Sequence, residues 1–432
     1  MSRVNQYGVI VFVLSLLFAG NMAQAQLRGH GGPVRALAIS PDGSTALSGS
    51  FDSSAIRWSL VRNAAEQVLR FHEGAVNAVA MMPDGRMATA GEDGRVAIWR
   101  PGEQQPATVF AGHRGPIVSL AVSPDGSLIA SASWDQTVRV WPIGGGPSRV
   151  LEGHQQNVNG VAFTPDGKSL VSAGYDATVR IWPLAGKGSP EIIMLPSPMN
   201  SVAVARDGEI LAAGADGKIY FLSADGEKHG EVEIGPSPII SLAISGDGKL
   251  AAAAGIRGSV GIVERQSRKL ERTLVGPGLP VWSVAFSPDN QMLLTGGADR
   301  LIRRWDVQSG EPIGSVSMGG PEDPLASYAG DHGAEVFRAC VACHTLKPDE
   351  GPRAGPTLSG IFGRKIATLP GYNFSPALQK LNIVWTPESI AKLFEVGPAT
   401  YTPGTKMPEQ KIGSPQDRDA LVQFLEKATK SR

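Results

Sequence analysis

Two cysteines and a histidine stand at a spacing that can hold a metal-bearing cofactor. Cys340, Cys343 and His344 form a CxxCH sequence that uses both cysteines of the 432-residue chain. Each thiol can form a thioether with a haem vinyl group, and the adjacent imidazole can bind the iron. Two intervening residues let one short helical turn present both sulfurs. The sequence therefore predicts one covalently attached haem c per chain.

The alternative interpretation is a redox dithiol, or a chance CxxC next to a histidine. A dithiol of this spacing is expected beside a βαβ pattern. The residues around 340–344 show no such pattern, which favours haem attachment.

The first 25 residues have the features of a secretory signal peptide. Arg3 supplies a positive charge, an apolar run covers residues 9–19, and Ala23 and Ala25 form a small-x-small cleavage pattern. We expect cleavage after Ala25 and export to a bacterial periplasm, which suits a c-type haem. The alternative is an N-terminal membrane anchor, although the run is shorter than the roughly 20 residues of a usual span.

The charge of the chain is balanced, with 40 Lys and Arg against 40 Asp and Glu. Binding to nucleic acid or to an anionic membrane would need a basic excess. The composition therefore gives no support for a nucleic-acid partner.

A turn sequence recurs through the first three quarters of the chain. Its aspartates stand 40 to 42 residues apart, at positions 42, 84, 125, 166, 207, 247 and 289. Around the third turn, short β-prone runs cover residues 118–122 and 128–133, and another ends at Trp141. Asp-Gly between apolar runs predicts a hairpin, and this period is that of four-stranded propeller blades.

The repeats resemble the WD-repeat family, because Gly-His and Trp marks recur in them. The pairs are His30 with Trp58, His72 with Trp99, His113 with Trp141, and His154 with Trp182. The resemblance implies an all-β, seven-bladed propeller over residues 27–318. It also implies that His, Ser or Thr, Asp and Trp are hydrogen-bonded in each such blade, so these histidines are structural.

Blade three leaves one choice open, because either Ser131 or Ser133 could join His113, Asp135 and Trp141. In blade four the set is His154, Ser172, Asp176 and Trp182. The match weakens in blades five and six, where Phe221 and Val263 stand near the tryptophan position. We expect those blades to be less rigidly cross-linked.

Ring closure has two candidate strands in the sequence. Residues 24–28 resemble an outer strand, but cleavage after Ala25 would cut into them. Residues 312–318 could replace them. The prediction is that the C-terminal segment closes the ring.

The β pattern stops at a Gly, Pro and acidic stretch, which predicts a linker over residues 319–330. Helical character follows at 333–339 and again at 417–429, where Leu421, Phe424 and Leu425 share one helix face. The predicted organisation is an all-β domain followed by an all-α domain over residues 331–430.

Residues 331–430 resemble class I cytochrome c of the mitochondrial and photosynthetic-bacterial type. The motifs are CxxCH, Gly355-Pro356-Thr357-Leu358, Gly363-Arg364-Lys365, Pro370-Gly371-Tyr372, Trp385, and Tyr401 to Pro408 around Met407. The resemblance implies that His344 and Met407 bind the iron. It implies that the Pro356 carbonyl accepts the Nδ1 proton of His344, that Arg364 and Trp385 hold a haem propionate, and that Thr405 hydrogen-bonds near the haem.

The numbers of methionines and histidines also support Met407 as the second iron ligand, since it is the only methionine after Met318 and no histidine follows His344. In the alternative, Met407 packs in the core, and water or a lysine takes the sixth position on the iron.

Phe394 and Phe374 depart from the family, which commonly has tyrosines there, so the tuning of the reduction potential is open. Four lysines, 347, 365, 406 and 411, could steer an acidic partner.

The leading functional prediction is an exported carrier of single electrons, not an enzyme, with the propeller as a protein-docking platform. Its partner would be a periplasmic redox protein or a membrane oxidase or reductase. One alternative is an enzyme whose propeller binds a substrate or a second cofactor and whose haem accepts electrons. Another is a redox-sensing scaffold.

Overall fold

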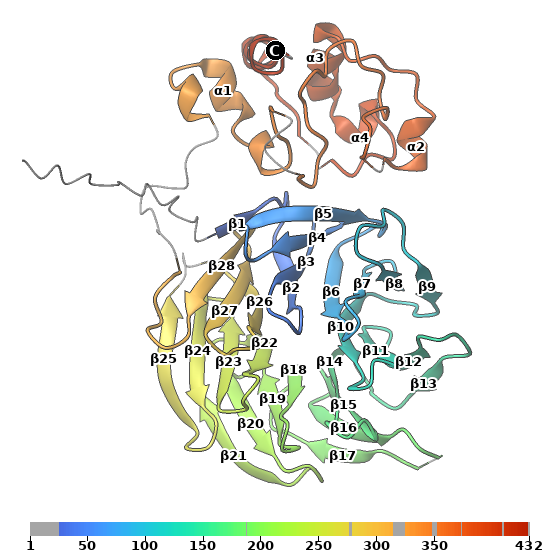
Figure 1. The fold of residues 1–432 in the computed structure, drawn as a ribbon, viewed down its shortest axis with the longest axis vertical. Coiled ribbons are helices and arrows are strands. Elements are labelled where there is room, and N and C mark those ends of the chain that lie inside the picture. Colours follow the sequence, from blue (N-terminus) through green and yellow to red (C-terminus); the bar gives the residue numbers. More distant parts are fainter. Residues whose placement is uncertain are drawn as a thin grey trace, which may run out of the picture.

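Figure 1 shows two domains, a ring of β-sheets and a helical domain that lies above strands β1 and β5. The computed structural model describes residues 26–186, 188–275, 279–313, 325–347, 352–372, 374–407 and 410–430. The predicted signal peptide, residues 1–25, lies outside the described residues, as does the first half of the predicted linker, residues 319–324.

The described part of the ring consists of seven four-stranded antiparallel sheets, which confirms the predicted seven-bladed propeller. Blades one to four are β2 (Val34–Ile39), β3 (Thr45–Ser50), β4 (Ser54–Ser59) and β5 (Ala64–Arg70); β6 (Val76–Met81), β7 (Met87–Gly91), β8 (Arg95–Trp99) and β9 (Thr108–Ala111); β10 (Ile117–Val122), β11 (Leu128–Ser133), β12 (Val138–Pro142) and β13 (Arg149–Leu151); and β14 (Val158–Phe163), β15 (Ser169–Gly174), β16 (Thr178–Pro183) and β17 (Glu191–Met194).

Blades five and six are β18 (Met199–Val204), β19 (Ile210–Gly214), β20 (Lys218–Leu222) and β21 (Lys228–Glu233); and β22 (Ile239–Ile244), β23 (Leu250–Gly255), β24 (Ser259–Glu264) and β25 (Lys269–Val275). Blade seven is made of β26 (Val281–Phe286), β27 (Met292–Gly297), β28 (Leu301–Asp306) and β1 (Gln26–Arg28).

The repeated Pro-Asp-Gly sequence makes the hairpin between the first two strands of a blade. In blade one, Asp42 Oδ1 accepts the Ser44 N–H at 3.1 Å, and Gly43 has a φ of 71°. That positive φ favours glycine, since a Cβ is strained there. The same geometry recurs at Asp125 and Gly126, so one local signal sets the register of successive blades.

Each of the first four blades contains the hydrogen-bonded set that the resemblance implies. In blade three His113 Nδ1 lies 2.8 Å from Asp135 Oδ2, and His113 Nε2 lies 2.8 Å from Ser131 Oγ. Trp141 Nε1 donates to the same oxygen at 2.9 Å. Ser131 is therefore the member of the set, whereas the Ser133 hydroxyl donates to a turn carbonyl.

Ser131→Ala should lower the free energy of unfolding of the propeller by about 2 kcal/mol, because it leaves two buried ring nitrogens without a partner. Urea titration of the intact chain would measure this. Ser127→Ala is the control, since that exposed hydroxyl bonds only within its turn, and it should change the value by no more than about 0.5 kcal/mol. Equal effects of the two changes would contradict the structural role of the set.

Blades five and six lack the tryptophan but keep its register. Phe221 pairs with Leu211, and Val263 pairs with Ala251, as Trp141 pairs with Ile129. Both replacements are fully buried. They fill the space by packing, and neither side chain has an N–H with which to complete the hydrogen-bonded set.

The prediction that the C-terminal segment closes the ring was wrong. Strand β1 pairs antiparallel with β28, with Leu27 opposite Ile302. Leu27 is 1% exposed and packs in the core shared by blades seven and one. Three residues are enough to close the ring because the Leu27 side chain is completely buried. The strand begins at Gln26, so the predicted cleavage after Ala25 would leave it intact. In the C-terminal segment, Pro312 bridges Trp305 and the Ile313 N–H donates to the Arg304 carbonyl at 2.9 Å, beyond the part of β28 that β1 covers, and residues 314–318 lie outside the described part.

The helical domain contains η1 (Ala326–Tyr328), α1 (His332–Phe337), η2 (Cys340–Ala342), α2 (Pro376–Gln379), α3 (Pro387–Val396), α4 (Pro398–Tyr401) and α5 (Pro415–Ala428). Its core includes Leu325, so packed structure begins within the span predicted as linker. None of the helices in the described part of the chain has the length and apolar character needed to cross a bilayer.

Helices α1 and α5 cross tightly, as the predicted helix pair requires. The rings of Phe337 and Phe424 pack at a tilt of 42°, with their centroids 5.4 Å apart. A Cβ at Gly333 would overlap the Ala420 carbonyl oxygen, so only glycine permits this approach. The crossing fixes the end of α1, from which the chain enters the CxxCH sequence.

Candidate haem site

The CxxCH sequence forms one tight turn at the end of α1. Cys343 N–H and His344 N–H both donate to the Cys340 carbonyl, at 3.1 Å and 3.0 Å. This turn directs Cys340, Cys343 and His344 into one cavity. Burial raises the pKa of Cys340 to about 12 and that of Cys343 to about 11. Redox dithiols have lowered thiol pKa values, whereas burial shifts both values here in the opposite direction.

The imidazole of His344 is held by one ring nitrogen. Nδ1 lies 2.7 Å from the Pro356 carbonyl oxygen, which accepts its proton and leaves the Nε2 lone pair free to bind a metal. Burial lowers the pKa of His344 below its usual value, so the ring is neutral. A Cβ at Gly355 would lie 2.6 Å from His344 Cε1, so this position must be glycine for the ring to fit.

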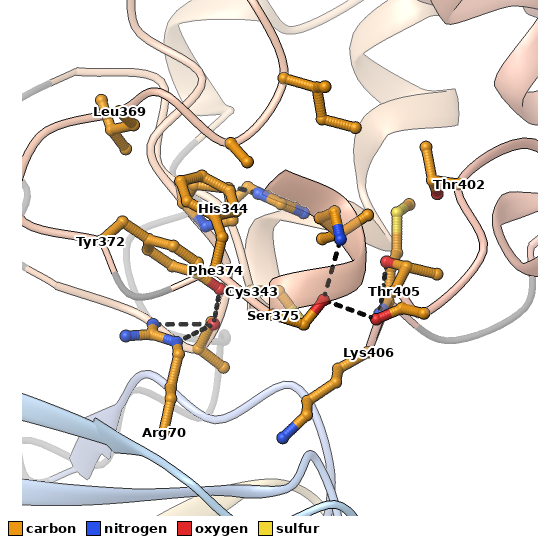
Figure 2. Close-up of a pocket in the computed structure, with 18 of the residues that line it drawn as sticks. Arg70, Cys343, His344, Leu369, Tyr372, Phe374, Ser375, Thr402, Thr405 and Lys406 are labelled. Atoms are coloured by element: carbon orange, nitrogen blue, oxygen red, sulfur yellow. Dashed lines mark hydrogen bonds between the residues drawn. The ribbon is translucent and has the colours of Figure 1, made fainter. Parts of the chain in front are cut away.

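A cavity of about 910 Å³ lies beside these groups, and Figure 2 shows part of its lining. Its size is within the range of cofactor sites. All eight site residues predicted from the sequence line it: Cys340, Cys343, His344, Pro356, Arg364, Trp385, Thr405 and Met407. Its apolar walls include Leu358, Ile361, Ile366, Leu393 and Phe394.

Met407 reaches the cavity from a loop that is braced at several points. Thr405 Oγ1 accepts the Met407 N–H at 3.1 Å, and Thr405 N–H donates to the Thr402 carbonyl. Ser375 Oγ donates to the Gly404 carbonyl at 2.9 Å, as Figure 2 shows. The thioether is half-buried against the domain core. Thr405 therefore contributes by holding the backbone that carries Met407.

Arg364 and Trp385 lie on adjacent backbone segments. Trp385 N–H donates to the Arg364 carbonyl at 3.0 Å, which ties the two segments together. The Arg364 guanidinium donates to the carbonyls of Ser359 and Thr357. Burial lowers the pKa of Arg364. A guanidinium has five N–H donors. Besides its bonds to these two carbonyls, the partly buried Arg364 can therefore donate to a carboxylate such as a haem propionate.

The residues present therefore fit a haem c. Two thiols, a neutral imidazole and a thioether are the donors that covalent attachment and two axial bonds require. Phe374 and Phe394 both line the cavity and supply no hydroxyl. Tyr372 packs against Phe374, with ring centroids 4.5 Å apart, and donates its hydroxyl to the Ala354 carbonyl at 2.7 Å.

Sequence reasoning missed that the propeller also lines this cavity. Asp52, Arg70 and Phe71 belong to its wall, together with Ser53, Ser54, Glu73, Arg95 and Gln105. No sequence signal could have found them, because they come from blades one and two, more than 200 residues before the CxxCH sequence. Only the packing of the two domains brings them there.

Comparison with known proteins divides the chain in the same way. Residues 330–429 match the family model "Cytochrome c", and five segments match "WD domain, G-beta repeat": residues 22–59, 64–100, 104–142, 145–183 and 268–306. Blades five and six, which lack the tryptophan, fall largely outside these matches.

Several cytochromes c are similar to the helical domain. A cytochrome c of Cochliobolus lunatus is 41% identical over 99 residues, which are 23% of this chain and 91% of that protein. A cytochrome c of Arabidopsis thaliana is 41% identical over 99 residues, 23% of this chain and 88% of that protein. A cytochrome c homolog of Rickettsia felis is 39% identical over 95 residues, 22% of this chain and 54% of that protein.

Proposed function

Since this chain belongs to the cytochrome c family through residues 330–429, behind a WD-repeat propeller, we propose that it is an exported carrier that exchanges single electrons with a periplasmic redox protein or a membrane oxidase or reductase. The observation that carries this proposal is the cavity on which Cys340, Cys343, His344 and Met407 converge. The predicted signal peptide supports the periplasmic location.

Each site residue has a defined task in this function. Haem iron, when bound, changes between the ferrous and ferric states and so accepts or releases one electron. Cys340 and Cys343 would supply the thioether sulfurs, while His344 and Met407 would hold the iron. Pro356 holds the His344 tautomer, and the apolar walls exclude water. If His344 and Met407 both bind the iron, no position would be left there for a substrate, which favours electron transfer over catalysis.

The propeller would keep this carrier near its partner. WD repeats indicate protein interaction, and a tether raises the effective concentration of the second domain without adding new contacts. The alternative of a second haem in the propeller would need a histidine ligand. His30, His72, His113 and His154 each contact an Asp and a Ser or Thr. His229 contacts Glu209 and Arg268.

Expression in a host that attaches c-type haem tests the proposal. We expect one covalent haem per chain, reversible one-electron titration, and mature protein in the periplasmic fraction with Gln26 as its first residue. More than one haem per chain would favour the enzyme alternative. Retention in the membrane fraction with residues 1–25 still present would instead indicate an anchor.

A further inference from the structure

The two domains meet at the second thioether cysteine. Ala354 N–H donates to the Gly29 carbonyl at 3.1 Å, which joins the loop after the CxxCH turn to the start of blade one. Two residues further, a Cβ at Gly31 would overlap Cys343 Sγ. The propeller backbone therefore lies directly against the sulfur that attaches one side of the haem.

Arg70, at the end of β5, makes several contacts with the helical domain. Its guanidinium lies 3.9 Å from the ring centroid of Tyr372. Its Nε and Nη2 donate to the Ala354 carbonyl at 3.0 Å and 2.8 Å, and Nη2 also donates to the Arg353 carbonyl. Figure 2 shows Arg70 rising from the propeller to the same oxygen that Tyr372 binds. Guanidinium is suited to such combined stacking and forked donation.

A lysine of the methionine loop also points to the propeller. The Lys406 ammonium donates to the His72 carbonyl at the start of blade two. Lys406 is one of the four lysines that could steer an acidic partner, and here it is bound within the chain. The surface that would meet a partner beside Met407 thus faces blades one and two.

We propose that Gly31, Asp52, Arg70 and His72 form a cap over the haem side beside Cys343, and that a protein partner exchanges electrons there only after the cap separates. This inference rests on the proposed electron-carrier function. A haem attached through Cys343 would lie beside the propeller, because Asp52 and Arg70 line the same cavity as Cys343. Electron tunnelling weakens steeply with distance, so a bulky partner is slowed, whereas a small reductant is affected less.

The charge of Asp52 should also affect the midpoint potential of the haem. Its carboxylate accepts the Gly31 N–H at 2.8 Å, and its side chain is only 5% exposed. A buried negative charge beside the haem stabilises the ferric state, which carries one more positive charge. Removal of the charge should therefore make the midpoint potential more positive, provided that the domains are docked.

Arg70→Ala tests the cap. The two electron donors used as probes are ascorbate, which is small, and a reduced soluble cytochrome c, which is a protein. In stopped-flow experiments on the haem-loaded chain, we expect the rate constant with the protein probe to rise about tenfold, the factor that follows from the loss of hydrogen bonds to a charged group. The ascorbate rate should change much less. Arg149→Ala is the matched control, because Arg149 donates to the Leu184 carbonyl away from the helical domain.

Asp52→Asn and Asp135→Asn form a second matched pair. Both carboxylates bind a blade histidine, at 2.9 Å and 2.8 Å, but only Asp52 lies beside Cys343. We expect a more positive potential in Asp52→Asn alone. Coloured variants with unchanged protein-probe rates, or with equal potentials in this pair, would overturn the cap. A colourless wild-type chain would overturn the proposed function instead.

Discussion

Replacement of Cys340 and Cys343 together by serine should leave the chain without covalently held haem. The hydroxyl of serine does not form the thioether, and these are the only two cysteines in the sequence. Extraction with acidified acetone, followed by absorption spectroscopy of the protein fraction, would measure the loss. The single change Cys340→Ser is the control, since Cys343 can still form one thioether.

The same double replacement should unfold much of the helical domain but not the propeller. The cavity is lined by Leu358, Ile361 and Leu393, and these side chains lose their contacts when nothing fills it. The propeller has separate cores of its own between its blades. Circular dichroism should show loss of helix with retained β signal. Haem that resists extraction in the double variant would contradict covalent attachment at these residues.

Met407→Ala should lower the midpoint potential and open the sixth coordination position. A methionine sulfur paired with histidine raises the potential of a haem, and Met407 is the methionine among the cavity-lining residues. Potentiometric titration would measure the change. Binding of added imidazole, followed optically, should become much tighter because the protein ligand no longer competes for the iron.

Met194→Ala is the matched control for this experiment, since Met194 is 70% exposed on β17 of the propeller. It should alter neither the potential nor imidazole binding. A Met407→Ala protein that loses stability but keeps its potential and its resistance to imidazole would show that Met407 only packs in the core.

Local chemistry explains why much of this protein could be predicted from sequence. The Pro-Asp-Gly hairpins are encoded within four residues, because the Asp carboxylate and the positive φ at Gly act inside the turn. The propeller was therefore predicted correctly, whereas the cytochrome c domain was identified by the resemblance of its motifs to that family. In blade three, sequence left Ser131 and Ser133 as equal candidates, and only the strand register showed which hydroxyl lies between His113 and Trp141.

Ring closure was predicted wrongly because it depends on one long-range pairing. The prediction assumed that cleavage after Ala25 would remove residues 24–28 as a closing strand and leave residues 312–318, but the outcome depends on the burial of a single side chain. Leu27 finds a place between blades seven and one, which no local pattern specifies. The cap was not foreseen at all, since neither Arg70 nor Gly31 belongs to a chemical motif.

The sequence by itself determined the repeat, the two cysteines and His344, because their spacing follows from turns and covalent reach along the chain, and Met407 was identified by resemblance and by counting. Tertiary structure decided which strand closes the ring and which face of the propeller meets the haem side. Those outcomes depend on burial and contact between residues hundreds of positions apart, as between Arg70 and Ala354, and such contacts exist only once both domains have folded.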